Sequence, residues 1–264
     1  RISCFGSGIR VGRCGYTPWM TTAAAIIIGD EILSAKVRDV NTPLLIDFFA
    51  ELGVDLERIA VIGDELEGIA AEVAACSKKY DVVITSGGVG PTHDDCTVRG
   101  VADAFGVAVV RHPDIEEMIR GYWGERFTES ALRMAEVPES SRLFYGDDGL
   151  LPLVVIKNVY LFPGVPRLFA AKLPSLRREI SGTPKVVHGV FLNADESRVA
   201  PLLGRVAEEC SNVKIGSYPR FGEKTDHRLW ISIEAVDADR VAAATERLLD
   251  LLKDEEVVRV ERSD

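Results

Sequence analysis

One loop combines glycines with carboxylates in a spacing that suits phosphate chemistry. Residues 86–95 read SGGVGPTHDD and follow a short apolar run. Gly87, Gly88 and Gly90 permit backbone conformations in which successive N–H groups converge on an anion. The helix predicted to follow them adds the partial positive charge of its N-terminus. The pattern therefore predicts a phosphate-binding loop.

Two adjacent aspartates in the same loop oppose an anion. Asp94 or Asp95 would repel a phosphate charge about 4 Å away by about 4 kcal/mol at an effective dielectric of roughly 20. A divalent cation between carboxylate and phosphate oxygens removes this conflict, and Mg²⁺ typically uses one or two carboxylates for it. We therefore expect Asp95, Asp94 or both to hold Mg²⁺ or a similar ion in metal-assisted phosphoryl chemistry. Adjacent side chains point in different directions, so one aspartate could cap the following helix while the other holds the metal. A structural alternative stays open, because aspartates after a glycine turn also begin helices.

Further polar residues follow the ends of other predicted strands, where ligands of open parallel sheets bind. Asp30 and Glu31 follow the first apolar run and Asp64 follows the second, although all three also suit helix caps. His93 could act as a base, but a lone loop histidine is more often solvated. Cys96 has no partner base in the sequence, so we interpret it as a packing residue.

The elements that must position this loop alternate between strands and helices. The predicted strands are 23–29, 54–62, 81–85 and 107–111, and the predicted helices are 42–52, 65–78 and 95–105. Asn41 suits the N-cap of the first helix, and Gly53 lies just past its end. Strands separated by helices indicate a doubly wound, mostly parallel α/β sheet.

The order of predicted strands and helices changes in the second half of the chain. Residues 112–150 are predicted as a helical insertion, followed by two strands and a helix up to residue 180. The turn-rich SGTPK at 181–185 is the predicted boundary. Beyond it, the order strand, helix, strand, strand, helix, strand predicts a smaller α+β domain of the ferredoxin-like βαββαβ type. The predicted division is a leader at 1–21, a doubly wound domain at 22–182 and the α+β domain at 183–264.

Charge and composition disfavour several classes of partner. The chain has 31 basic and 41 acidic residues, a net charge of −10, which disfavours nucleic acid and anionic membranes. No apolar run approaches the roughly 18 to 20 residues of a membrane span. Five scattered cysteines without a CxxC pair argue against a disulfide framework and a structural zinc site, and suit a reducing compartment.

The first twenty residues contain three arginines and no acid. This composition suggests either the remnant of an organellar transit peptide or a misassigned start, with Met20 near the real one. The expected location is accordingly cytoplasmic, with a mitochondrial or plastid location as the alternative.

Four stretches resemble the molybdopterin-binding (MoaB/Mog-like) domain family. They are GDEIL at 29–33, Asn41-Thr42, GGVGPTHDDCT at 87–97 and FPGVP at 162–166. Within that superfamily the chain is most similar to the N-terminal domain of CinA and to the molybdopterin-binding-like domain of eukaryotic FAD synthases. NVYLFPGVP, ADESRVAPLL and IGSYPRFG favour the FAD synthase version. The resemblance spans about residues 22–252.

The resemblance implies a function, a cofactor and a set of site residues. CinA-type members imply a metal-dependent pyrophosphatase of ADP-ribose-like dinucleotides, and the FAD synthase version implies hydrolysis of FAD. Asp95, with Asp94, would bind Mg²⁺ or a similar divalent cation. The residues implied for the pyrophosphate and nucleotide are Gly87, Gly88, Gly90, Thr92, Asp30, Asn41 and Gly164.

Two other functions stay open, and both use the same loop. One is a molybdopterin adenylyltransferase-like protein of molybdenum cofactor biosynthesis, with a pterin as its ligand. The other is a non-catalytic nucleotide-binding module that regulates FAD synthesis. The glycine loop does not distinguish FAD from ADP-ribose, because both contain the pyrophosphate. The family resemblance also favours a homo-oligomer.

Overall fold

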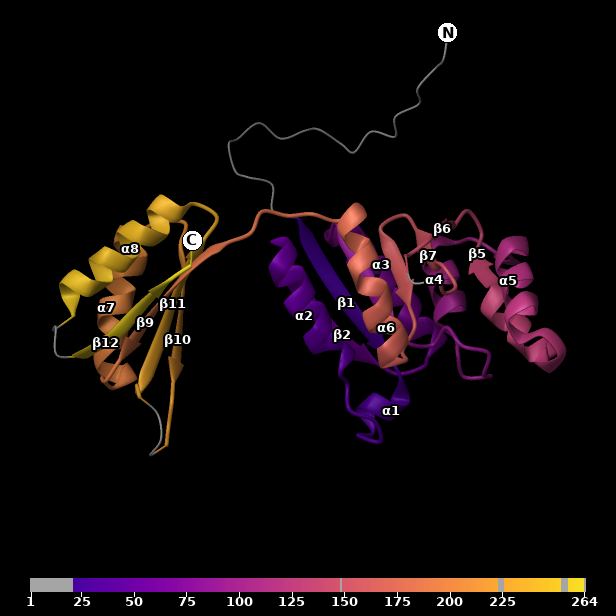
Figure 1. The fold of residues 1–264 in the computed structure, drawn as a ribbon, viewed down its shortest axis with the longest axis horizontal. Coiled ribbons are helices and arrows are strands. Elements are labelled where there is room, and N and C mark those ends of the chain that lie inside the picture. Colours follow the sequence, from indigo (N-terminus) through magenta and orange to yellow (C-terminus); the bar gives the residue numbers. More distant parts are fainter. Residues whose placement is uncertain (1–20, 148, 223–225, 253–255, 264) are drawn as a thin grey trace, which may run out of the picture.

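The computed structural model of the chain describes residues 21–147, 149–222, 226–252 and 256–263. These residues form two bodies, each with its own sheet (Figure 1). The predictions for the first twenty residues lie outside this description. Among the helices of the described residues, none has the length and apolar character needed to cross a bilayer.

The first body is built on a six-stranded sheet in the order β2-β1-β3-β8-β7-β6. Its strands are β1 (Thr22–Ile28), β2 (Asp55–Ile62), β3 (Val82–Ser86), β6 (Arg142–Phe144), β7 (Leu153–Ile156) and β8 (Val159–Phe162). β1 pairs in parallel with β2 and β3, and β3 pairs in parallel with β8. β7 runs opposite to the other five strands of this sheet and pairs antiparallel with both β6 and β8. The predicted doubly wound, mostly parallel sheet is confirmed.

Helices cover both faces of this sheet. The helices are α2 (Asn41–Leu52) and α6 (Pro166–Lys172) on one face, and α3 (Leu66–Lys79) and α4 (Thr97–Phe105) on the other. Successive side chains of a strand point to opposite faces. Ala25 of β1 therefore packs against the α2 side, whereas Ile26 packs against the α3 side. Burial on both faces explains why β1 is apolar along its whole length.

The start of α2 differs from its prediction, whereas its end agrees. Gly53 ends the helix with a left-handed φ of 67°, as expected. Asn41 was predicted to cap the N-terminus, and this is wrong. The carboxylate of Asp39 accepts the N–H groups of Asn41 and Thr42 instead, at 3.0 and 3.1 Å. The Asn41 side chain is thus left for another role.

The insertion contains strands that its helical pattern did not reveal. It consists of α5 (Pro113–Trp123), two short 3₁₀ helices (Gly124–Arg126 and Glu129–Ala135), β5 (Glu136–Pro138) and β6. β5 pairs with β4 (Val109–Arg111) as a separate antiparallel ribbon. Three-residue strands are too short to show an alternating pattern, so the sequence predicted only the helical part. A small core centred on Ile115 and Ile119 holds the insertion together.

The second body has the predicted βαββαβ order. Its elements are β9 (Val186–Leu192), α7 (Glu196–Glu209), β10 (Lys214–Pro219), β11 (Leu229–Ala235), α8 (Ala238–Leu251) and β12 (Val257–Arg262). The strands form an antiparallel sheet in the order β10-β11-β9-β12. Val199 of α7 and Leu248 of α8 share one core with Ile231 and Val190 of the sheet, so both helices cover the same face.

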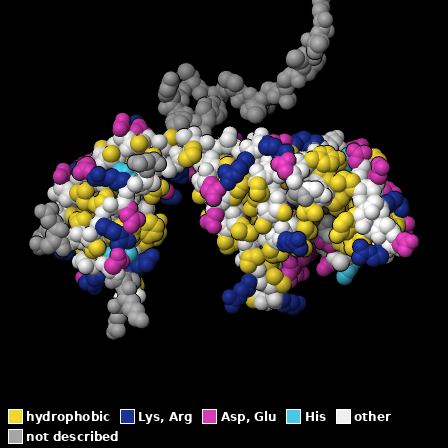
Figure 2. All heavy atoms as spheres, viewed as in Figure 1, with side chains coloured by type: hydrophobic (Ala, Val, Ile, Leu, Met, Phe, Trp, Pro, Cys, Tyr) yellow, Lys and Arg dark blue, Asp and Glu magenta, His cyan; other side chains and the backbone are white. Residues whose placement is uncertain are grey.

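The segment that joins the two bodies is bonded to the first one. Gly182 N–H donates to Leu52 O at 2.9 Å, and the ammonium of Lys185 lies 2.5 Å from the carboxylate of Asp55. On the face of the molecule seen in Figure 2, acidic and basic side chains are interspersed over both bodies. The acidic side chains on this face therefore do not form one continuous anionic surface.

Candidate functional site

Three loops meet where β1, β2 and β3 end. The short helix α1 (Asp30–Leu33) follows β1, Gly63 and Asp64 follow β2, and the glycine loop follows β3. Gly29 N–H donates to Ile62 O at 3.0 Å, which ties the first two loops together. The pocket between the three loops has a volume of about 210 Å³. Its lining residues are Ile28, Gly29, Glu31, Asp64, Gly88, Asp94 and Asp95.

The pocket is strongly acidic. Its lining includes the carboxylates of Glu31, Asp64, Asp94 and Asp95. Within the described part of the chain, no lysine or arginine forms an ion pair with any of them. Burial raises the pKa of Asp64, and the negative charges of Asp30, Glu31 and Asp94 raise it further. The protein itself therefore leaves this negative charge largely uncompensated.

The glycine loop needs glycine at its first two positions. Gly87 and Gly88 have φ angles of 109° and 63°, which other residues rarely adopt. A Cβ on Gly87 would overlap the carbonyl oxygen of Ile28, and one on Gly88 would overlap the hydroxyl of Thr97. Gly90 has no positive φ, but a Cβ there would come within 2.7 Å of Asp95 Oδ2. Gly90 thus admits the Asp95 carboxylate.

The amides of the loop are not equivalent. Gly87 N–H donates to Phe162 O at 3.1 Å and extends the pairing of β3 with β8. It is therefore not available to a phosphate, although the sequence predicted this role for it. The N–H groups of Gly88 and Gly90 have no hydrogen-bond acceptor among the described residues. The amides of Gly88 and Gly90 are thus free to donate to an anion.

Thr92 and Asp95 close the loop on itself. The backbone N–H of Thr92 donates to Asp95 Oδ2 at 2.8 Å, and the Thr92 hydroxyl donates to the same oxygen. One oxygen of Asp95 is thus committed within the loop. Asp94 and His93 are exposed neighbours, with Nδ1 of the histidine 3.8 Å from Oδ1 of the aspartate.

Helix α4 begins later than predicted. It starts at Thr97 rather than near Asp95, and no side chain caps it. The two aspartates therefore belong to the loop and not to the helix. Cys96 is buried, its thiol donates to Asp64 O at 3.2 Å, and burial raises its pKa. These observations agree with a packing role for the thiol.

Asn41 joins the glycine loop to the turn after β8. Its Nδ2 donates to Ser86 Oγ at 3.0 Å and to Gly164 O at 2.8 Å. Gly164 lies so close to the loop that a Cβ on it would be 3.1 Å from Gly87 Cα. Asn41 is only 5% exposed, and its Oδ1 is buried without a hydrogen-bond partner. The structure thus places Asn41 and Gly164, two of the residues predicted for phosphate or nucleotide binding, in the frame that fixes the loop.

Glu31 and Asp64 contribute more to the pocket than the sequence indicated. Asp30 was the predicted site residue after β1, but Glu31 lines the pocket, while Asp30 N–H donates to Asp64 Oδ2 at 2.9 Å. Asp64 was interpreted as the cap of α3. That interpretation is wrong, because the helix begins at Leu66 after Glu65 and has no side-chain cap. The signal was present, since both carboxylates follow strands that are neighbours in the sheet.

The pocket carboxylates do not by themselves form a closed metal site. No three histidine, cysteine, aspartate or glutamate side chains within the described residues converge closely enough to hold an ion. Oxygen-only donors nevertheless suit a hard divalent cation, which commonly takes one or two carboxylates and completes its shell with phosphate oxygens and water.

Two family models match the chain, one for each body. The model described as "Probable molybdopterin binding domain" matches residues 24–189. The model described as "FAD synthase, middle domain" matches residues 184–261.

Relatives from animals and archaea agree with these matches. A "Probable FAD synthase" of Caenorhabditis briggsae is 33% identical over 261 residues, covering 88% of this chain and 49% of the relative. The protein PH0439 of Pyrococcus horikoshii is 33% identical over 222 residues, covering 77% of this chain and 87% of the relative. The chain spans about half the length of the FAD synthases that it matches.

One solved structure supports the fold of the first body. It is the crystal structure of the protein CinA, described as of unknown function, from Thermoplasma acidophilum. It is 30% identical, with a TM-score of 0.56, and the match covers 61% of this chain and 98% of that structure.

Proposed function

Because the chain belongs to the molybdopterin-binding domain family, with an FAD synthase middle domain after it, we propose that its acidic pocket binds a dinucleotide pyrophosphate and hydrolyses it with a divalent cation. The observation that carries this proposal is the lining of one pocket by Gly88 of the glycine loop and by four carboxylates. A phosphate loop and unpaired carboxylates are compatible only if a cation lies between their charges.

The proposed substrates are FAD and ADP-ribose-like dinucleotides. Both contain the pyrophosphate that the loop would recognise. The names of two relatives, both probable FAD synthases, support FAD, whereas ADP-ribose rests on the resemblance to CinA-type proteins. The pocket of about 210 Å³ suits the pyrophosphate and its immediate neighbours, so the remaining groups of a dinucleotide would extend outside it.

Different groups of the chain would bind the phosphates and the cation. The free N–H groups of Gly88 and Gly90 would donate to phosphate oxygens. One or two of the carboxylates that line the pocket would supply cation ligands, and phosphate oxygens and water would complete the shell; the candidates are Glu31, Asp64, Asp94 and the remaining oxygen of Asp95. A bound divalent cation would offset the repulsion between these carboxylates and the phosphates and would polarise the phosphorus–oxygen bonds.

The proposed reaction is hydrolysis between the two phosphorus atoms. The oxygen of water bonds to the adenylyl phosphorus, and the bond from that phosphorus to the bridging oxygen breaks. The bridging oxygen leaves with the other phosphate group. AMP and a second monophosphate result, which is FMN when FAD is the substrate, and the two protons of the water pass to the phosphate products or to the solvent.

Chromatographic measurement of AMP tests the proposal. The purified chain is incubated with FAD or ADP-ribose and with Mg²⁺, Mn²⁺ or Co²⁺. We expect AMP release that requires the metal and that falls at least about a hundredfold in Asp94→Asn, since a positioned ligand is worth several kcal/mol. Asp103→Asn on the exposed side of α4 is the matched control. Equal rates for wild type and Asp94→Asn would refute this mechanism.

A second candidate is a nucleotide-binding module that regulates FAD synthesis without turnover. Two observations favour it: one oxygen of Asp95 is already committed to Thr92, and no three ligands converge among the described residues. A rise in melting temperature with FAD or ADP-ribose, without AMP release under any metal, would support this candidate over the hydrolase.

A further inference from the structure

The sheet of the second body has one face that none of the described helices covers. Helices α7 and α8 pack on the face that carries Val190 and Ile231. Neighbours along each strand point the other way. Phe191 and Trp230 pair directly across β9 and β11, and they therefore lie side by side on the open face.

An aromatic row crosses this open face. Tyr218 of β10 pairs with Trp230, and Arg259 of β12 pairs with Phe191, so the row runs over all four strands. The rings of Tyr218 and Trp230 are stacked at 4.7 Å between centroids. The guanidinium of Arg259 lies 3.7 Å from the centroid of Phe191. The rings are thus held in place by packing on one another and by the guanidinium of Arg259.

The next row of the face contains three small residues and one glutamate, and the small residues leave a pocket beside the rings. Its residues, in strand order, are Gly216, Ser232, Gly189 and Glu261. A Cβ on Gly189 would lie 2.9 Å from Phe191 Cε2 and 3.1 Å from Trp230 Nε1. The pocket over Gly189 has a volume of about 360 Å³. Pockets that hold small molecules begin at about 300 Å³.

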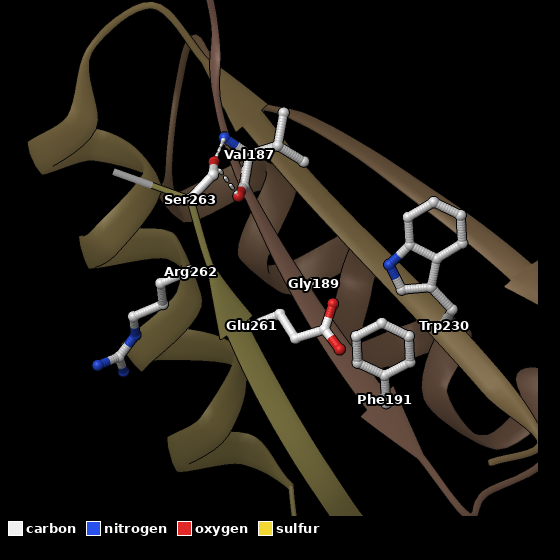
Figure 3. Close-up of a pocket in the computed structure, with 7 residues that line it drawn as sticks. All are labelled: Val187, Gly189, Phe191, Trp230, Glu261, Arg262 and Ser263. Carbon is white, nitrogen blue, oxygen red and sulfur yellow. Dashed lines mark hydrogen bonds between the residues drawn. The ribbon is translucent and has the colours of Figure 1, made fainter. Parts of the chain in front are cut away.

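A hydrogen-bond donor in this pocket has no partner. Trp230 Nε1 is buried and makes no hydrogen bond in the structure. Figure 3 shows the indole nitrogen of Trp230 and the carboxylate of Glu261 pointing toward one another across Gly189. An indole N–H can only donate, whereas a carboxylate can only accept. Arg259 Nε occupies one oxygen of Glu261 at 2.8 Å, and the other oxygen remains as an acceptor.

We propose that this pocket binds a planar heterocycle that carries a carbonyl beside a ring N–H, an edge that flavin, guanine and uracil rings share. The carbonyl would accept from Trp230 Nε1, and the ring N–H would donate to Glu261. The heterocycle would lie over Gly189 with this edge turned toward the indole, because an indole N–H donates in the plane of its own ring. The site lies in the second body and uses no residue of the acidic pocket.

Calorimetric titration of the full 264-residue chain tests this site. The ligands are riboflavin, guanosine and uridine, which have the required edge and differ in ring size, and adenosine, which lacks the edge. We expect at least one of the first three to bind, and adenosine to bind about tenfold more weakly or not at all. This difference corresponds to the loss of one well-placed hydrogen bond.

Paired tryptophan variants isolate the donor. Trp230→Phe keeps an aromatic ring but removes the N–H, and we expect about tenfold weaker binding. Trp123→Phe in the insertion makes the same chemical change away from this sheet and should bind as the wild type does. Gly189→Val should abolish binding by filling the floor. If Gly189→Val does not fold, Trp230→Phe decides the question.

Three results would overturn the proposal. They are the absence of binding by all of the ring ligands, equal affinity of Trp230→Phe and wild type, and equal affinity for adenosine. If size-exclusion chromatography also shows that Trp230→Phe separates a dimer, this face is a contact between copies of the chain. Asp94→Asn should leave ring binding unchanged, so this site and the proposed hydrolysis can fail separately.

Discussion

The backbone N–H of Asp30 donates a hydrogen bond of 2.9 Å to the carboxylate of Asp64. This bond joins the loop after β1 to the loop after β2, and it places the acceptor next to further negative charge. Burial raises the pKa of Asp64; the hydrogen bond from Asp30 lowers it by less, and the charges of Asp30, Glu31 and Asp94 add to the rise. Burial of the Asp64 carboxylate among these charges, rather than the bond itself, therefore weakens the folded protein in the absence of a cation.

Asp64→Asn should stabilise the metal-free chain at neutral pH. The amide oxygen still accepts the bond from Asp30, but the charge is gone. The gain should be small, below about 1 kcal/mol, because the side chain is only partly buried and water screens its charge. A raised folded pKa favours the protonated form, so the advantage over wild type should shrink as the pH falls toward the ordinary aspartate pKa of about 3.9.

Chemical denaturation between about pH 4 and pH 8 measures this difference. In contrast, added Mg²⁺ should raise the melting temperature of wild type more than that of Asp64→Asn. A variant that is less stable than wild type at neutral pH would show that the carboxylate does not carry unfavourable charge.

Asn41→Ala should loosen the frame of the glycine loop. The change removes the donor to Ser86 Oγ and Gly164 O at a buried position and leaves both acceptors without it. We expect a loss of about 1–3 kcal/mol in the free energy of unfolding, together with weaker dinucleotide binding. Asn193→Ala, at an exposed position in the second body, is the control and should stay within about 0.5 kcal/mol. Similar losses of stability in Asn41→Ala and Asn193→Ala would show that the Asn41 side chain does not hold the glycine loop in place.

Gly88→Ala and Gly106→Ala form a matched pair. Both glycines have nearly the same φ, 63° and 65°, so the backbone strain from alanine is shared. Only at Gly88 would the Cβ also overlap the Thr97 side chain, whereas nothing lies within 4 Å of a Cβ on Gly106. Gly106→Ala should cost about 1 kcal/mol of stability and Gly88→Ala at least about 1 kcal/mol more. Urea titrations measure both, and equal costs would contradict the expected overlap with Thr97.

His188 should make the second body sensitive to acid. The ring is buried, and the Thr245 hydroxyl already donates to Val241 O, so Nδ1–H of His188 donates to Thr245 Oγ1 at 2.9 Å. Burial lowers the pKa of His188, and the charge of Arg262 lowers it further.

The folded state therefore holds this ring neutral. Its contribution to stability is present above the unfolded pKa of about 6.5 and is lost as the pH falls through the lower folded pKa. His188→Gln should flatten the fall in stability below about pH 6.5, measured by thermal melting. The exposed His93→Gln should leave that profile unchanged, and a parallel fall in both variants would exclude His188 as the cause.

The sequence predicted the arrangement of the strands better than the roles of single side chains. Periodicity identified the parallel strands and the βαββαβ order, because burial of one or both faces imposes a pattern on the residues. Polar residues at strand ends carry no such pattern. Asn41 and Asp64 looked like helix caps, yet each bonds to a loop that is remote in sequence. The short strands β5 and β6 were missed because three residues cannot establish alternation.

Within the site, the glycine positions were more predictable than the donors. Positive φ at Gly87 and Gly88 follows from the residue type, and the structure has it. Whether an amide is free depends on the partner strand, and Gly87 N–H is taken by Phe162 from a distant part of the chain. A one-dimensional pattern does not contain that pairing.

The pairing of β3 with β8 also sets the order in which the protein can mature on the ribosome. A nascent chain that ends before residue 159 has made β3 and the glycine loop but lacks the strand that covers this edge. Phe162 O and Gly164 O, which hold Gly87 and Asn41, emerge last of all the groups that frame the pocket. Until then β3 presents an unpaired edge that other chains could join. The pocket is thus completed only after β8 and Gly164 have emerged, and premature termination before β8 would yield an aggregation-prone fragment rather than a partly active one.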